Sequence, residues 1–123
     1  MTGTSERAQV LVVEDDEDQL ALMTAMLERA GCDVLGLRTA EDAIEELRRR
    51  EPDVAIVDLL LPGIDGWELV STMRDAVPEC PVVIVSVLEE RRFPPGVPSL
   101  PKPFTRDQLL AALEQAVPGR RWS

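Results

Sequence analysis

Acidic, hydroxyl and amino side chains follow the short apolar runs of this sequence, and these side chains could do chemistry. Glu14 and Asp15 follow the first run, Asp58 the third, Ser86 the fourth, and Lys102 comes after a weaker fifth. If the runs are parallel strands, their carboxyl ends meet at one edge of the sheet, where open α/β sheets bind their ligands. We therefore expect carboxylates, a hydroxyl and an ammonium group to converge there.

The predicted cluster has the composition of a metal site. Three carboxylates, from Glu14, Asp15 and Asp58, would repel one another, and one would take up a proton unless a cation lay between them. Mg²⁺ prefers carboxylate, carbonyl and water oxygens, and together with Lys102 it would balance the three negative charges. Lys102 is the only lysine of the chain, and its compact ammonium suits a phosphoryl oxygen. The sequence therefore predicts a Mg²⁺ site.

Each of these residues also has an ordinary structural interpretation. The acidic run 14–18 could complement the N-terminal dipole of a following helix. Asp58 could belong to a turn before Pro62 and Gly63, and Ser86 could bond to backbone at a strand end. Only the combination of the residues indicates a site.

Short apolar runs alternate with longer amphipathic stretches, which predicts one α/β domain with a parallel sheet. The stretch between 87 and 98 is too short and too rich in proline for a normal crossover helix. We expect a flexible N-terminus over 1–8, the domain over 9–117 and a tail over 118–123. The predicted strands are 9–13, 34–37, 54–57, 82–85 and, more weakly, 97–100, and the predicted helices are 20–30, 40–50, 67–76 and 106–116.

Composition excludes several classes of function. The 123 residues contain no histidine, which excludes a Ser-His-Asp triad, a His-liganded zinc site and a phosphohistidine carrier. A net charge of −10 disfavours binding of nucleic acid or anionic membrane. The chain lacks a signal peptide and an apolar run of membrane-spanning length, and Cys32 and Cys80 are far apart, so we expect a cytoplasmic protein. It ends too early for an output domain, so it acts alone or belongs to a longer protein.

Four segments together resemble the receiver domain of bacterial two-component response regulators: VLVVEDDEDQL, VAIVDLLLPGIDGWEL, VVIVS and LPKPF. The resemblance covers about residues 9–116. It implies a flavodoxin-like (CheY-like) fold, with a five-stranded parallel sheet of order 2-1-3-4-5 and helices on both faces.

The resemblance also implies a function. Asp58 would accept a phosphoryl group from the phosphohistidine of a histidine kinase or phosphotransfer protein. Asp15, Asp58 and the Leu60 carbonyl would hold Mg²⁺, with Glu14 assisting through water and Asp16 peripheral. The added charge would draw Ser86 and Lys102 inward and switch a surface that binds a downstream protein, because charge-adding modifications act by local attraction. The domain would catalyse only its own phosphorylation and dephosphorylation.

The sequence departs from the family pattern at four places. The fourth helix is expected to be shortened or missing. Ser99 stands where many receivers have an aromatic residue, so their hydroxyl–aromatic relay cannot operate. Val87 replaces a small residue, which would restrict access to the site. Leu60 and Leu88 stand where polar side chains orient a hydrolytic water in some relatives, which predicts a long-lived phosphoryl group.

Three other functions remain open from the sequence. A receiver-like interaction module could be uncoupled from phosphorylation by drift over residues 87–101. A Mg²⁺-dependent phosphohydrolase could form an aspartyl phosphate, although such enzymes usually place a second Asp where Leu60 stands. A flavin module is disfavoured because the acids after the first strand would repel its phosphate.

Overall fold

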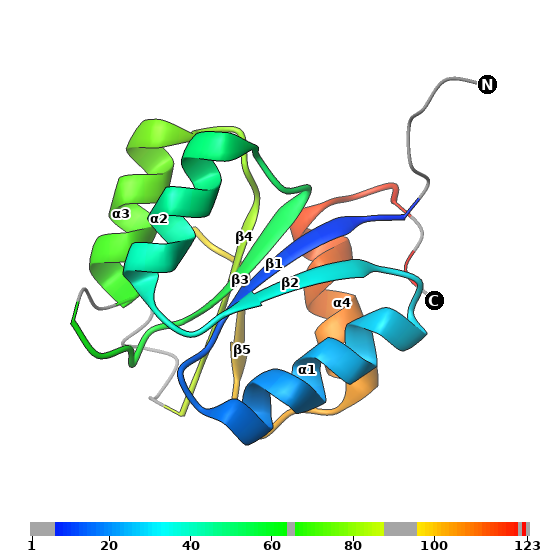
Figure 1. Ribbon diagram of the computed structural model, residues 1–123. Helices are drawn as coiled ribbons and strands as arrows, with labels where there is room; N and C mark the ends of the chain where they lie inside the picture. Colours follow the sequence, from blue (N-terminus) through cyan, green and yellow to red (C-terminus); the bar gives the residue numbers. More distant parts are fainter. Residues whose placement is uncertain (1–6, 64–65, 88–95, 121, 123) are drawn as a thin grey trace.

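The chain folds into a five-stranded parallel sheet of order β2-β1-β3-β4-β5 with helices on both faces (Figure 1). The computed structural model describes residues 7–63, 66–87, 96–120 and 122. The predicted fold class and strand order are confirmed. The strands are β1 (Gln9–Val13), β2 (Asp33–Leu37), β3 (Val54–Asp58), β4 (Val82–Ser86) and β5 (Ser99–Pro101), and the helices are α1 (Glu17–Arg29), α2 (Ala40–Arg49), α3 (Gly66–Ala76) and α4 (Arg106–Ala116).

The three central strands are apolar on both faces because helices cover both. Helices α2 and α3 lie on one face of the sheet, and α1 and α4 lie on the other (Figure 1). Successive β1 residues point to opposite faces: Leu11 and Val13 pack in the core under α2 and α3, and Val10 and Val12 in the core under α1 and α4. This burial fixes the register of the strands, and therefore which side chains stand at their carboxyl ends.

Helix caps fix where the helices begin. The Thr39 hydroxyl accepts the Asp42 N–H at the start of α2. Thr105 and Gln108 form a reciprocal capping box at the start of α4. Both helices therefore begin at the residue that the sequence predicts, 40 for α2 and 106 for α4. The Asp16 carboxylate accepts the Gln19 N–H and caps α1.

Strand β5 differs from its prediction in its bounds. The ladder with β4 pairs Ser99 with Ile84 and Pro101 with Ser86, so the strand begins two residues later than expected and ends one residue later. Pro101 is tolerated because β5 is an edge strand, where an N–H on the open side needs no strand partner. The predicted loss of the fourth helix concerns mostly residues 88–95, and Leu88 is among them; these lie outside the described residues. Among the helices that the structure describes, none has the length and apolar character needed to cross a membrane.

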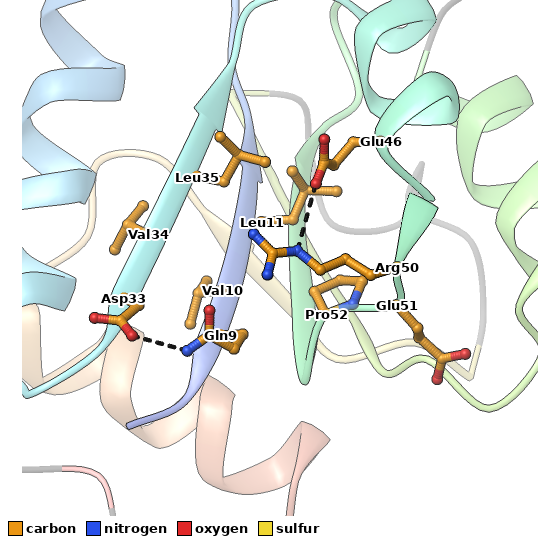
Figure 2. Close-up of a pocket in the computed structure, with 10 residues that line it drawn as sticks. All are labelled: Gln9, Val10, Leu11, Asp33, Val34, Leu35, Glu46, Arg50, Glu51 and Pro52. Atoms are coloured by element: carbon orange, nitrogen blue, oxygen red, sulfur yellow. Dashed lines mark hydrogen bonds and ion pairs between the residues drawn. The ribbon is translucent and has the colours of Figure 1, made fainter. Parts of the chain in front are cut away.

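A cavity of about 240 Å³ opens at the amino end of the sheet, between β1, β2 and the end of α2 (Figure 2). Gln9 and Asp33 are hydrogen-bonded at 2.8 Å on one side of it, and Arg50 pairs with Glu46 at 3.7 Å on the other. None of the predicted site residues lines this cavity. Asp33, Glu46 and Arg50 already have polar partners, and among the described residues the cavity gathers no cluster of acids, so the carboxyl edge remains the candidate site.

Both cysteines should be unreactive in the native protein. Cys32 and Cys80 are buried, and burial raises the pKa of both thiols, that of Cys80 to about 11. Since the thiolate is the reactive form, native protein at pH 8 should react with an aromatic disulfide reagent at least about 100-fold more slowly than a free thiol. Unfolding in guanidinium should expose both thiols. Rapid labelling of either cysteine before unfolding would contradict the described burial.

Candidate functional site

The predicted site residues stand at neighbouring strand ends. Glu14 follows β1 directly, Asp58 ends β3, and Ser86 ends β4. In the parallel ladders Asp58 pairs with Val85, which places Ser86 one step beyond it. Carboxylate oxygens of Glu14, Asp15 and Asp58 lie within 4.8 Å of one another. The fold therefore brings these acids together at the carboxyl edge, although Asp58 is 44 residues from Glu14 along the chain.

Lys102 reaches into the acidic cluster. Its Nζ donates to Asp58 Oδ2 at 2.7 Å and also to Glu14 Oε1. The Lys102 side chain is 9% exposed, so its ammonium lies among the carboxylates and not in bulk solvent. Burial alone would lower the pKa of Lys102, but the hydrogen bonds to Asp58 and Glu14 outweigh burial and leave this pKa raised. Lys102 therefore carries a positive charge inside the site at neutral pH.

Glu14 is the most deeply buried acid of the cluster, at 1% exposure. Burial raises the pKa of its carboxyl, against the opposing effects of the hydrogen bonds from Lys102 and from the Asp16 N–H at 3.1 Å. Residues of the acidic run therefore differ in what they contact. Glu14 belongs to the carboxylate cluster, whereas Asp16, expected to be peripheral, caps α1.

The two oxygens of Asp58 have different partners. Oδ1 accepts the Leu60 N–H at 2.9 Å, and Oδ2 accepts the Lys102 ammonium. These bonds fix the orientation of the carboxylate. Ser86 is fully buried, and its carbonyl accepts the Lys102 N–H at 2.8 Å, which anchors the backbone from which the lysine side chain extends.

Gly66 lies very close to the backbone of Asp58 and Leu59, a contact that the sequence did not predict. A Cβ at this position would lie 2.3 Å from Leu59 Cα and 2.5 Å from the Asp58 carbonyl oxygen. The Gly66 N–H also donates to the Leu59 carbonyl at 3.0 Å. The start of α3 therefore packs directly against the backbone that carries Asp58, and only glycine leaves room for this approach.

Gly66→Ala should destabilise the domain. The added methyl must displace the backbone of Asp58 and Leu59, which we expect to lower the free energy of unfolding by about 1–3 kcal/mol. Urea denaturation followed by circular dichroism measures this loss. Gly36→Ala is the control, because the three atoms nearest to a Cβ there all belong to the Leu20 side chain, which can shift more easily than backbone. Equal losses in the two variants would show that the backbone contact at Gly66 has no special weight.

Arg38 also lies at the carboxyl edge, one residue after β2, and was not among the predicted site residues. Its Nη2 and Nε donate to the Asp15 carbonyl at 3.0 and 3.2 Å. The only sequence feature that could have pointed to Arg38 is its position as a basic residue directly after a predicted strand. The sequence could not show which backbone atom this long side chain contacts.

The donor set fits a hard divalent cation. Three carboxylates from two neighbouring strand ends approach within 4.8 Å; those of Glu14 and Asp58 are buried and that of Asp15 is half-buried. Oxygen ligands of this kind are those that Mg²⁺ binds. Lys102 supplies one positive charge to this group of acids, so a divalent cation would bring the charge of the cluster close to neutral.

Comparison with known proteins identifies the family. Residues 10–114 match the model of the response regulator receiver domain. The chain is 30% identical over 122 residues to the DNA-binding transcriptional regulator NtrC of Escherichia coli (strain K12), covering 91% of this chain and 25% of NtrC. It is 25% identical to protein PilG of Pseudomonas aeruginosa, covering 96% of this chain and 93% of PilG. It therefore spans most of one relative and about a quarter of the other.

Solved structures agree with this assignment. A sensor protein from Polaromonas sp. JS666 superposes with a TM-score of 0.81 at 31% identity, covering 94% of this chain and 99% of that one. A response regulator receiver protein from Sinorhizobium medicae WSM419 gives a TM-score of 0.83 at 27% identity, covering 94% of this chain and 98% of that one. The chain belongs to the family of response regulator receiver domains, the phosphoacceptor signalling domains of two-component systems.

Proposed function

We propose that this domain receives one phosphoryl group on Asp58 from the phosphohistidine of a histidine kinase or phosphotransfer protein. The observation that carries the proposal is the position of the Lys102 ammonium, which is bonded to Asp58 and Glu14. A carboxylate nucleophile beside a fixed cation and two further acids is the arrangement that phosphoryl transfer requires, because the protein must position the nucleophile and neutralise the spread negative charge.

The residues of the chain have distinct tasks in the proposed transfer. An Asp58 oxygen attacks phosphorus, so that a P–O bond forms while the P–N bond to the donor imidazole breaks and leaves its electron pair on nitrogen. The Leu60 N–H holds the carboxylate in orientation, and protonated Lys102 offsets the negative charge of the phosphoryl oxygens. Glu14, Asp15, Asp58 and the Leu60 carbonyl would hold Mg²⁺. When bound, Mg²⁺ would supply charge neutralisation at the phosphoryl oxygens.

The proposed output is a change of protein-binding surface. An acyl phosphate carries about one more negative charge than the Asp58 carboxylate, and this draws Lys102 and the Ser86 hydroxyl toward it. The backbone N–H of Lys102 donates to the Ser86 carbonyl, so a shift of one residue displaces the other. Because Ser99 lacks an aromatic ring, the signal must leave by another route, to a downstream protein target in the cytoplasm.

Mass measurement of the intact protein tests the proposal. After incubation with Mg²⁺ and acetyl phosphate, the protein should gain the mass of one phosphoryl group, and the gain should disappear when a chelator is present. No gain with acetyl phosphate or with a cognate kinase would overturn the proposal in favour of the uncoupled interaction module. Release of many equivalents of phosphate per protein would instead favour the phosphohydrolase.

A further inference from the structure

We propose that Arg38 is a positioning residue that holds the Asp15 backbone, and through it the mouth of the acidic cluster, in the conformation that binds Mg²⁺. This inference rests on the proposed function for the identity of the metal. It assigns a role in the site to Arg38, which is not one of the acids of the cluster and which directly follows the neighbouring strand β2.

Two hydrogen bonds carry the inference. Arg38 Nε and Nη2 both donate to one oxygen, the Asp15 carbonyl, at 3.2 and 3.0 Å. A guanidinium presents its donors in a rigid plane, so two bonds to one acceptor fix direction as well as distance. A third nitrogen, Nη1, lies 3.5 Å from Glu17 Oε2. That ion pair is largely solvent-exposed and contributes little by itself.

The hydrogen bonds around Asp15 show why Arg38 matters for this residue in particular. Its neighbours in the chain are fixed by other groups, whereas the Asp15 carbonyl is bonded by Arg38. Glu14 is bonded to Lys102 and to the Asp16 N–H, and Asp16 is fixed as the cap of α1. On the other side the Glu14 N–H donates to the Leu37 carbonyl at 3.0 Å. The end of β2 thus holds the turn between β1 and α1 at two consecutive residues, first through the Leu37 carbonyl and then through the Arg38 guanidinium.

The charge of Arg38 and its hydrogen bonds predict opposite effects on metal binding. A positive charge near the cluster repels Mg²⁺, so if charge alone mattered, removing it would strengthen binding. If the two bonds to Asp15 position a ligand, removing them weakens binding, as loss of residues that orient metal ligands usually does. The sign of the change therefore separates the two roles.

A second arginine provides a matched control at the opposite end of the sheet. Arg7 Nη2 donates to the Cys32 carbonyl at 3.0 Å, and its Nε pairs with Asp33 at 2.7 Å. Its side chain is 52% exposed, against 57% for Arg38. Arg7 thus combines a carbonyl and a carboxylate contact as Arg38 does, but it lies at the amino edge, away from the acidic cluster.

The test compares Arg38→Met, Arg38→Lys and Arg7→Met by Mg²⁺ titration calorimetry, with thermal melting in a chelator to measure folding separately. Both Arg38 variants should bind Mg²⁺ about tenfold more weakly, since Lys keeps the charge but loses the two-bond geometry. Arg7→Met should bind Mg²⁺ as wild type does, even if its melting temperature falls.

Three outcomes would overturn the inference. Arg38→Met could bind Mg²⁺ as tightly as wild type or more tightly, Arg7→Met could lose the same affinity, or the wild type could bind no Mg²⁺. The first two leave the proposed function standing, provided that wild type gains one phosphoryl group. A wild type that binds Mg²⁺ in an Arg38-dependent way but gains no phosphoryl group overturns only the proposed phosphotransfer.

Discussion

Asp58→Asn should abolish phosphoryl uptake: we expect no detectable gain of mass with Mg²⁺ and acetyl phosphate, a loss of at least about 1,000-fold in rate. Asn preserves the shape of the side chain, and its amide oxygen still accepts the Leu60 N–H that Asp58 Oδ1 accepts. What disappears is the anionic oxygen that attacks phosphorus and forms the acyl phosphate. The measurement is a time course of intact mass under identical donor concentration.

Asp53→Asn is the matched control for this variant. Asp53 directly precedes the same strand β3 at its other end, and its carboxylate accepts the Gln9 N–H at 2.7 Å. The same chemical change there should leave uptake at the wild-type rate. If Asp58→Asn still gained a full phosphoryl group, or if Asp53→Asn also lost uptake, Asp58 could not be assigned as the acceptor.

Lys102→Met should change Mg²⁺ affinity and the rate of phosphoryl uptake in opposite directions. Without the ammonium, the carboxylates of Glu14 and Asp58 lose their shared positive partner, so Mg²⁺ should bind at least about tenfold more tightly. Phosphoryl uptake at saturating Mg²⁺ should nevertheless slow by about 100-fold, because a fixed positive group at the developing charge is lost. Calorimetry gives the first quantity, and the mass time course gives the second.

Lys102→Arg separates charge from side-chain shape. Arginine keeps the positive charge, so Mg²⁺ affinity should stay near that of wild type even where transfer is slower. The role assigned to Lys102 fails if the Met variant binds Mg²⁺ no more tightly than wild type. It also fails if the Met variant takes up phosphoryl at the wild-type rate.

The sequence predicts the fold well where burial determines the residue type. The central strands consist of branched apolar residues because helices cover both faces, and the predicted ranges 9–13, 54–57 and 82–85 differ from the observed strands by at most one residue. Edge strands give a weaker signal. Strand β5 is bounded by its ladder with β4 and includes Pro101, and neither the start nor the end of such a ladder is encoded in residue types alone.

The sequence likewise predicts some features of the candidate site and not others. Strand order places Glu14, Asp58 and Ser86 at one edge, so their convergence follows from topology that the sequence pattern predicts. The contact of Arg38 with the Asp15 carbonyl depends on the path of a long side chain and leaves no periodic signal. The need for glycine at position 66 depends on how closely α3 approaches Asp58 and Leu59, a distance that only the folded backbone defines.

The position of the acyl phosphate tests the central claim most directly. Wild type treated with Mg²⁺ and acetyl phosphate is reduced with borohydride, which converts an aspartyl phosphate to homoserine, and its peptides are sequenced by mass spectrometry. The account predicts homoserine at position 58, in an amount that matches the phosphoryl gain. Modification of another carboxylate, or a phosphoryl group that resists borohydride and lies on Ser86, would contradict it.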